Sequence, residues 1–403
     1  MSLRKCSVFM MDLWAIVPYY TAYLSKALLG EGVDLRVGSI TYYLDPTCFS
    51  SRGIAVDPGL MDVVGKFPLP RLPRRALKMA EAMVNLAALS VRFLVSPPDV
   101  IHVQYLPMLK WRVPLDFWFV KLCRKRGSKI VLTVHDLLPH DTGQRYKRTF
   151  EAVYRSVDGI ICHSDHIRAR LAAEFSVAEE RVSVIPHGPF FYDLPASGEE
   201  ETLRGFGVGP GEALVLWQGI IFPYKGVDLL LRAWQRVEVS GSSAWLVIAG
   251  TGSPDLLEEI REQVRELGLK RVKLHFRFIS TEELVALYRA ADVVVYPYRA
   301  ITTSGALATG LALGKAIVAS DLPVFRELLT DRESALLVDP LDVAALGEAL
   351  LAVTQDAALR ERLAGKVRAM QFGDQSWLSI AKKTMETYEG VLTPPSPLGG
   401  GTR

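Results

Sequence analysis

Short apolar runs of strand length alternate with longer, helix-like segments along almost the whole chain. The runs are rich in Val, Ile and other residues that favour strands, and turn-forming residues bound them. Six lie in the first half, at residues 5–10, 35–41, 100–104, 130–134, 159–162 and 182–185, and six in the second, at 213–217, 244–249, 272–276, 293–296, 316–319 and 335–338. This alternation predicts an α/β fold in which helices cover parallel sheets.

A chain of 403 residues is longer than one hydrophobic core usually fills, so we expect two domains. Residues 194–211, rich in Pro, Gly, Ser and Glu, have the composition of a linker. We therefore predict two doubly wound, Rossmann-like domains, 1–195 and 196–375, that face each other across a cleft. Ser376 is the expected N-cap of a helical segment, 376–392, that packs back on the first domain. Residues 393–403 are expected to be a disordered tail.

The cysteines and the apolar runs indicate where the protein works. Its four cysteines are scattered and form no CxxC pair, which argues against a disulfide framework or a zinc site and fits a reducing compartment. We expect neither a signal peptide nor a spanning helix, because charged residues interrupt the longest apolar run, 79–95. The sequence therefore favours a cytoplasmic protein.

Positive charge is concentrated in residues 60–130, which hold 13 Lys or Arg against 4 Asp or Glu. Aromatic residues interleave with the bases, as in Phe117-Trp118-Phe119-Val120-Lys121. This mixture suits a peripheral position on an anionic membrane surface, with Arg74, Arg75 and Lys78 as contacts, or a polyanionic substrate. The alternative is a solvated basic face over a partly buried helix. No nucleic-acid-binding motif accompanies the charge, so we expect no nucleic-acid partner.

The segment 291–321 predicts an anion site. Its β-branched run ends in Tyr296-Pro297-Tyr298, and residues 302–305 (Thr-Thr-Ser-Gly) then open a helix of small residues. Free amides at a helix start, just beyond the carboxyl end of a strand, bind phosphate readily, and ligands of open α/β sheets bind at that edge. The candidate residues for gripping a diphosphate are Tyr298, Arg299, Thr303, Ser304 and Gly305.

A second candidate lies at 217–228, where a buried strand is followed by Gly219, by Lys225-Gly226 and then by an amphipathic helix. Gly219 allows a ligand close to the backbone, and Lys225 offers a compact positive charge for phosphate. The alternative reading of Lys225 is a solvated loop lysine. Gly250, in a Gly-Thr-Gly turn after another strand, is expected beneath the nucleotide.

His135 and Asp136 follow a first-domain strand. His135 could bond a sugar hydroxyl, and either residue could accept a proton, although a packing or capping pair is the alternative. His102 and His275 are interpreted as structural histidines. The chain has no DxD sequence for a metal clamp, so we expect no metal or other cofactor. Lys225, with Arg277 or Arg299 and helix amides, would then balance the diphosphate charge.

In order and spacing these segments resemble the family 4 glycosyltransferases of GT-B fold (glycosyl transferases group 1). The resemblance rests on TVHD at 133–136, HSD at 163–165, IPHG at 185–188, GIIFPYKGVDLLLRAW at 219–234, IAGTG at 248–252, ADVVVYPY at 291–298 and GKAIVASDLP at 314–323. It implies a nucleoside-diphosphate sugar bound mainly by the second domain. Lys225 would contact the diphosphate, Arg277 and Phe278 would flank the base, and His135 would contact the donor sugar.

The chain departs from that family at the usual pair of glutamates, which would fall on Ile301 and Thr309. It resembles an atypical subset with a PYR…TSG loop. In this subset Tyr298, Thr303, Ser304 and the downstream Glu327 are expected to replace the glutamates.

We therefore expect a metal-independent, hexosyltransferase-type enzyme. It would move a sugar from a nucleoside-diphosphate sugar to a hydroxyl acceptor, most plausibly a lipid-linked or cell-surface glycan. Catalysis is assigned to His135, Asp136 and Lys225, and acceptor binding to Asp12, Trp14, Tyr19 and Tyr20. The alternatives are a sugar-nucleotide epimerase or hydrolase on the same fold, and a non-catalytic sugar-nucleotide-binding module.

Overall fold

The computed structural model describes residues 6–67, 70–111, 114–138, 143–194, 198–208, 212–372 and 374–393. The chain forms two compact units. The first contains the residues up to Pro186 and those from Trp377 onward, and the second runs from His187 to Ser376. The chain therefore passes from the first unit to the second at Pro186, rather than at residue 195.

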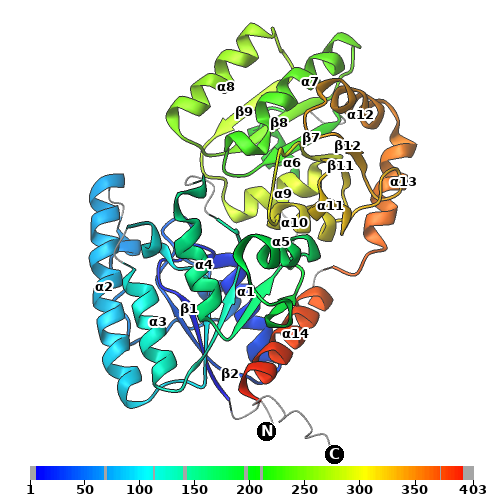
Figure 1. Cartoon of the computed structure of the whole chain (residues 1–403). Coiled ribbons are helices and arrows are strands. Elements are labelled where there is room, and N and C mark those ends of the chain that lie inside the picture. Colours follow the sequence, from blue (N-terminus) through cyan, green and yellow to red (C-terminus); the bar gives the residue numbers. More distant parts are fainter. Residues whose placement is uncertain are drawn as a thin grey trace, which may run out of the picture. The chain divides into compact units, whose positions relative to one another are not determined.

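The first unit is built on a six-stranded parallel sheet with the order β2-β1-β3-β4-β5-β6 (Figure 1). Its strands are β1 (Ser7–Asp12), β2 (Asp34–Ser39), β3 (Val100–Val103), β4 (Lys129–Thr133), β5 (Gly159–Cys162) and β6 (Val182–Val184). β1 pairs with β2 on one side and β3 on the other, with Val8 level with Leu35 and Val100. Because the order reverses between β1 and β3, their carboxyl ends flank a crevice where α/β sheets commonly bind ligands.

Helices cover both faces of this sheet. They are α1 (Pro18–Gly30), α2 (Arg71–Val95), α3 (Leu115–Lys125), α4 (Lys147–Ser156), α5 (Asp165–Phe175) and α14 (Asp374–Leu392). Single 3₁₀ turns connect them, namely η2 (Ser50–Arg52), η3 (Val64–Lys66), η4 (Pro107–Trp111), η5 (Gly143–Tyr146) and η6 (Glu179–Arg181). α2 and α3 lie side by side over one face (Figure 1). Phe93 of α2 packs against Phe9 of β1 in the core.

The second unit has its own six-stranded parallel sheet, in the order β12-β11-β10-β7-β8-β9. The strands are β7 (Leu214–Gln218), β8 (Trp245–Gly250), β9 (Val272–Phe276), β10 (Val293–Tyr296), β11 (Ala316–Ser320) and β12 (Leu336–Val338). The order reverses between β7 and β10, which is the switch point of a doubly wound sheet. Val293 and Val294 of β10 are fully buried, as strands covered on both faces require, and Pro297 prevents the strand from continuing.

The helices of the second unit are capped by local sequence. They are α6 (Glu199–Gly205), α7 (Val227–Val239), α8 (Pro254–Glu266), α9 (Thr281–Ala290), α10 (Gly305–Ala312), α11 (Pro323–Arg326), α12 (Val343–Gln355) and α13 (Ala357–Arg368), with the 3₁₀ turn η7 at Pro223–Lys225. Ser280 and Glu283 form a capping box on α9. Ser304 caps α10, and Asp342 caps α12. Separate apolar clusters pack on the two faces of the sheet, one around Trp234 and the other around Tyr296.

The structure confirms the twelve predicted strands, with ends within two residues of the predicted ones, and the α/β fold with two doubly wound sheets. Two local predictions were wrong. The last helix begins at Asp374, so Ser376 lies inside it and is not its N-cap. Residues 194–211 are not a simple linker, because they include α6, whose Leu203 packs with neighbouring Phe206 into the core of the second unit. Of the predicted tail, all but Thr393 lies outside the described residues.

Candidate functional site

Two glycines bring the ends of β7 and β8 into close contact at the carboxyl edge of the second sheet. Gly219 has φ 140° and Gly250 has φ 151°, conformations that other residues rarely adopt. A Cβ atom on Gly250 would lie 1.8 Å from the carbonyl oxygen of Gly219, which no side chain tolerates. The predicted close approach at these glycines is therefore present, and it is first of all an approach between two segments of backbone.

Lys225 extends from η7 back over this edge. Its ammonium nitrogen would be 3.0 Å from a Cβ atom on Gly219, and it lies 5.8 Å from the centre of the Tyr298 ring. The next residue, Gly226, has φ 66°, and a Cβ atom there would be 1.9 Å from the carbonyl oxygen of Pro297. The backbone after β7 and after β10 thus fixes the position of this lysine, and its contact with a diphosphate stays a prediction.

The two arginines proposed to assist Lys225 are engaged in ion pairs. Arg299 makes a bidentate pair with Asp228 at 2.6 and 2.8 Å and also donates to the carbonyl of Pro223. Arg277 pairs with Glu283 at 2.7 and 2.8 Å, which lowers the pKa of that carboxyl to about 2. In this structure each arginine charge is thus balanced by a carboxylate of the same unit, and a role of either arginine toward a phosphate stays a prediction.

The predicted helix start at residues 302–305 is present as the amino end of α10. The Ser304 hydroxyl accepts a hydrogen bond from the amide of Leu307 at 3.1 Å. The preceding amides of the first turn have no acceptor within the helix, and the helix dipole makes this end favourable for an anion. Gly305 packs so tightly that a Cβ atom would be 2.7 Å from the Phe190 ring. Thr303 lies half-exposed beside it.

One position of the missing glutamates, two of their expected replacements and the residue expected to flank the base have different surroundings. Thr309 is buried; its hydroxyl donates to the carbonyl of Gly305 at 2.8 Å and accepts from the amide of Phe190 at 3.1 Å. Tyr298 is buried as well, and desolvation raises its pKa, so it remains a neutral phenol. Glu327 is exposed at the end of α11, and Phe278 is half-buried. Among these, Glu327 is the accessible carboxylate.

In the first unit, His135 lies just past β4 and belongs to a buried chain of polar side chains. Its Nε2 is 3.1 Å from Oε1 of Gln104, and its Nδ1 is 3.4 Å from Nε2 of His163. His163 Nδ1 donates to the carbonyl of Ile185 at 2.9 Å, and burial lowers the pKa of His163 to about 4. The neutral His163 ring therefore accepts at Nε2, so His135 faces an acceptor on each side. A bond from His135 to a sugar hydroxyl would have to replace one of these two contacts.

The buried series of polar side chains continues to the C-terminal helix, α14. The side-chain amide nitrogen (Nε2) of Gln104 lies 3.2 Å from Nε2 of His102, which is also 2.7 Å from the Thr133 hydroxyl. His102 Nδ1 is 2.7 Å from the hydroxyl of Tyr388 in α14. Full burial lowers the pKa of His102 to about 3, which confirms the interpretation of His102 as a satisfied core histidine. Gln104 was missed in the sequence, although it directly follows a buried strand, as His135 does.

Asp12 and Tyr20 are unsuited to the predicted role in acceptor binding. Asp12 is 1% exposed and accepts from the amides of Ile16 and Val17, so it holds the loop before α1. Tyr20 is equally buried, with its ring centre 4.8 Å from that of His135.

The other two acceptor candidates, Trp14 and Tyr19, are half-exposed, and Tyr19 donates to Asp45 at 3.0 Å. Asp136 is also half-exposed, next to His135. These three side chains are therefore accessible for the roles that the sequence assigns to them.

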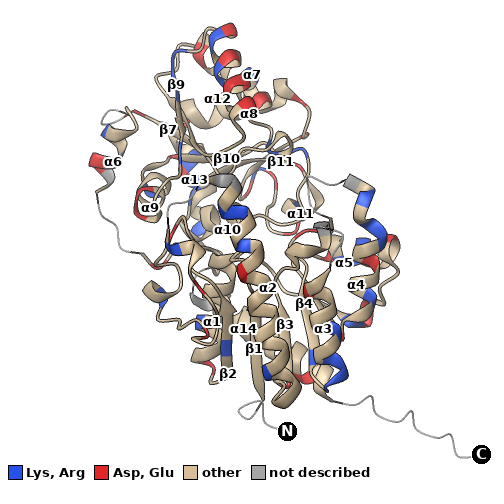
Figure 2. Ribbon diagram, turned by 90° about the vertical axis from the view of Figure 1, so that its left-hand side faces the viewer, with Lys and Arg blue, Asp and Glu red and all other residues tan. Residues whose placement is uncertain are grey.

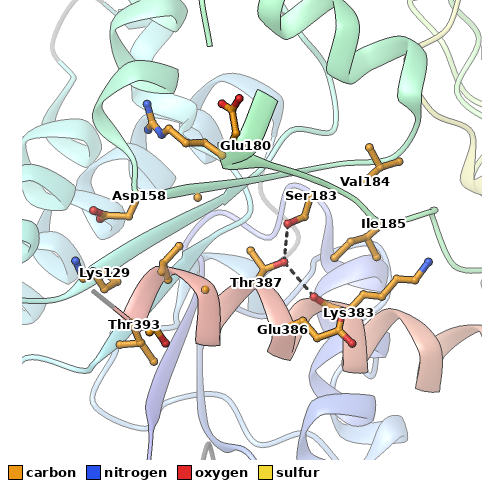
Figure 3. Close-up of a pocket in the computed structure, with 15 residues that line it drawn as sticks. Lys129, Asp158, Glu180, Ser183, Val184, Ile185, Lys383, Glu386, Thr387 and Thr393 are labelled. Atoms are coloured by element: carbon orange, nitrogen blue, oxygen red, sulfur yellow. Dashed lines mark hydrogen bonds between the residues drawn. The ribbon is translucent and has the colours of Figure 1, made fainter. Parts of the chain in front are cut away.

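A hollow of about 850 Å³ lies elsewhere in the first unit, between α14 and the sheet (Figure 3). Lys129 and Gly159, which begin β4 and β5, line it together with Thr387 and Lys383 of α14. The Thr387 hydroxyl donates to that of Ser183 at 2.9 Å. Because β4 and β5 begin here, the hollow is at the opposite end of these strands from His135, and we do not assign the acceptor to it.

Only one of the three basic residues predicted to contact a membrane is exposed. Lys78 donates to the carbonyl of Trp14 at 3.0 Å, and desolvation lowers its pKa. The guanidinium of Arg74 stacks over the Tyr43 ring at 4.1 Å, and Arg75 is exposed. Arg75 is thus the fully exposed member of the three, whereas Arg74 and Lys78 are half-buried, and the electrostatic membrane surface stays a prediction. None of the described helices is both long and apolar enough to cross a bilayer.

The two sheets and their switch points define a protein of GT-B type, and comparisons with known proteins agree. The family model described as Glycosyltransferase Family 4 matches residues 17–188, and that described as Glycosyl transferases group 1 matches residues 212–356. Between them they cover most of the chain. The protein belongs to the family 4, group 1 glycosyltransferases.

Individual relatives are distant. A D-inositol 3-phosphate glycosyltransferase of Xylanimonas cellulosilytica is 23% identical over 92% of this chain and 90% of that protein. A phosphatidyl-myo-inositol mannosyltransferase of Mycobacterium leprae is 35% identical, over 43% of this chain and 45% of that protein. An uncharacterized glycosyltransferase of Methanocaldococcus jannaschii is matched over 59% of its length. Among solved structures, Anabaena HepE in complex with UDP and glucose has a TM-score of 0.73 at 18% identity, with 95% of this chain and 99% of that one covered.

Proposed function

We propose that this protein transfers a hexose from a nucleoside-diphosphate sugar to a hydroxyl group of a lipid-linked or cell-surface glycan. The observation that carries the proposal is the position of Lys225, whose ammonium group lies against Gly219 at the switch point of the second sheet. Family membership supports it. The HepE structures contain UDP or UDP-glucose, and the mycobacterial relative is named for a lipid acceptor.

The proposed chemistry needs positive charge where the diphosphate departs. As the bond between sugar and phosphate breaks, negative charge develops on the diphosphate oxygens. A preorganised cation and helix amides stabilise that charge without reorganisation, which is the largest single contribution in many enzymes. We assign this role to Lys225 and to the first amides of α10, at Gly305 and Ala306. His135 and Asp136 stay the proposed catalytic residues of the first unit.

We also propose that the reaction requires no metal ion. The described residues contain no cluster of three or more His, Cys, Asp or Glu placed to hold one. The proposal itself rests on Lys225 and the α10 amides, which can supply the charge that a bound cation would otherwise supply. Activity that a chelator leaves unchanged, in buffer without added metal, is the expected result, and restoration of activity by Mg²⁺ or Mn²⁺ would contradict it.

Lys225→Ala tests the assignment. Loss of one preorganised donor to a developing anion costs about 100-fold in kcat, so we expect kcat/KM to fall by about that factor. Lys270→Ala is the matched control, because Lys270 is exposed in the same unit. A change for Lys225→Ala within about threefold, a difference below ~1 kcal/mol, would refute the assignment.

The same assay separates the alternatives. Donor consumption that depends on an added acceptor indicates transfer. Consumption or epimerisation of the donor without an acceptor would indicate the epimerase or hydrolase.

A thermal-shift screen of UDP-, GDP- and ADP-sugars identifies the donor, because a ligand at about 100 times its Kd stabilises a protein by about 2.7 kcal/mol. Stabilisation without any turnover would indicate a binding module.

A further inference from the structure

The outward face of α2 is almost entirely apolar. The exposed described side chains of this helix, in order, are Pro73, Arg75, Ala76, Leu77, Ala80, Met83, Val84, Ala87, Ala88, Val91, Leu94 and Val95. Arg75 is the one charged member of that set, and Val91 and Val95 are 67% and 83% exposed. From Ala76 to Val95 this α2 face is roughly 28 Å long at 1.5 Å per residue. Figure 2 shows α2 mostly tan, with blue gathered near its first turns.

Two polar side chains of α2, Glu81 and Asn85, point the other way and bind a loop. Glu81 is 3% exposed and accepts from the amides of Val63 and Val64, at 2.6 and 3.2 Å. Asn85 accepts from the amide of Met61 at 2.7 Å and donates to its carbonyl at 2.9 Å. These bonds hold the loop beside the helix with its own apolar side chains outward. Met61, Val63 and Phe67 are 43%, 49% and 57% exposed. The loop therefore extends the apolar surface of the α2 face.

The charges around the α2 face are positive. The acidic residues Glu81 and Asp116 of this region are buried, Asp62 pairs with Lys66 at 3.3 Å, and exposed Asp99 accepts hydrogen bonds from Ser7. Arg75 is exposed near the amino end of the helix. At the carboxyl end, exposed Arg126 donates to the carbonyl of Leu94 at 2.7 Å. Positive charge thus flanks both ends of the apolar stripe.

Neighbouring α3 adds an exposed tryptophan and further positive charge. Trp118 is 56% exposed, and the exposed bases Lys121 and Lys125 lie on the same helix, whereas Arg124 is paired with Asp158 at 3.1 Å. Tryptophan is the residue most typical of the boundary between water and lipid, where one side of its ring is apolar and its N–H is solvated.

The apolar face of α2 and the positive charge around it indicate which kind of partner this surface fits. Exposed apolar surface of this extent marks an interaction site. If a second copy of the chain bound this surface, the positive side chains around the two α2 faces would repel each other, which opposes self-association. An anionic bilayer accepts both the apolar stripe and the surrounding cations. We propose that α2 lies flat in the interfacial layer of an anionic membrane, with the α2 face and the 61–67 loop inserted among the lipids.

The proposed binding differs from the electrostatic surface that the sequence predicts. At 0.1 M ionic strength, salt largely screens interactions between exposed charges that are more than about 10 Å apart, whereas burial of apolar side chains is not screened. A substantial part of the binding should therefore survive high salt. The inference deepens the proposed lipid-linked acceptor by naming the surface at which the enzyme meets it. It is tested by binding alone, so either proposal can fail without the other.

The test is sedimentation of the full chain with vesicles, at low and high salt. The vesicles are phosphatidylcholine alone or phosphatidylcholine with phosphatidylglycerol. Val91→Glu and Val95→Glu should each weaken binding to the anionic vesicles by about tenfold, equivalent to ~1.4 kcal/mol. Val239→Glu is the matched control, because Val239 ends α7 as Val95 ends α2 and is equally exposed at 83%. Arg75→Gln should weaken binding at low salt more than at high salt.

Three results would overturn the proposal. The first is binding that high salt abolishes and that the two valine substitutions leave unchanged, which would make the contact purely electrostatic. The second is a dimer in light scattering that Val91→Glu and Val95→Glu dissociate, with no vesicle binding, which would identify a second copy as the partner. The third is a monomer that binds neither vesicle. Unchanged thermal unfolding of the variants confirms that each is folded.

Discussion

Gly226 offers a quantitative test of how the site around Lys225 is held. Its φ of 66° is nearly the same as that of Gly268, at 64°. Alanine in this left-handed region costs about 1–2 kcal/mol at either position. The surroundings differ, because a Cβ atom on Gly226 would be 1.9 Å from the carbonyl oxygen of Pro297, whereas one on Gly268 would meet no atom within 4 Å. Overpacking of this kind costs about 1–3 kcal/mol more.

Gly226→Ala should therefore destabilise the second unit by about 1–3 kcal/mol more than Gly268→Ala. For a unit of this size, 1 kcal/mol corresponds to about 2–4 °C in Tm. Differential scanning calorimetry of both variants measures the difference within one unit, so the strain common to both cancels. Relief of the clash must also move Lys225, so the KM for the donor should rise in Gly226→Ala alone. Equal Tm values for the two variants would refute the steric argument.

Acidification should destabilise the first unit, because the pKa values of His102 and His163 are lowered to about 3 and about 4 while the unfolded histidines titrate near 6.5. Between these pKa values the unfolded chain binds more protons than the folded one. The free energy of unfolding therefore falls as pH drops, by about 1.4 kcal/mol per pH unit for each histidine. Burial raises the pKa of Asp116 to about 6, so this carboxyl opposes the effect over part of the range. Urea unfolding at pH 7 and pH 5 should show a smaller loss in His102→Gln than in the wild type, and equal losses would contradict the burial argument. A double-mutant cycle of Arg299→Ala and Asp228→Ala should give a coupling energy of about 1 kcal/mol or less, because the pair is 31% and 38% exposed. If Arg299 mainly serves that pair, Arg299→Ala should weaken donor binding less than Lys225→Ala does in the same titration, and the reverse order would restore Arg299 as the principal phosphate ligand.

Most strands were predictable because the inner strands of a parallel sheet are buried on both faces and so appear as short continuous apolar runs. β10 is an example, with Val293 to Val295 buried and Pro297 ending the run. The carboxyl edge of the second sheet was predictable for a related reason. Gly219 directly follows β7, and Lys225 and Ser304 lie in the loops after β7 and β10. In a parallel sheet the carboxyl ends of strands share one edge.

Pairings between residues distant in the chain were not predictable. Asp228 lies 71 residues from Arg299, so nothing local indicates that the arginine is already paired. Glu81 and Asn85 looked like interruptions of an apolar run, whereas they bind a loop about 20 residues upstream and leave the apolar residues outward. Leu203 and Phe206 lie in a segment of linker composition, and only the tertiary structure shows that they are core residues.

The return of the last helix to the first unit has a consequence for biosynthesis. A ribosome must finish residues 187–376 before it can supply α14, whose Tyr388 closes the polar chain at His102. The second unit is continuous in sequence and can be completed while the first still lacks its final helix. The half of the protein that is translated first is therefore the last to reach its native state, and until then Nδ1 of its buried His102 lacks the Tyr388 hydroxyl.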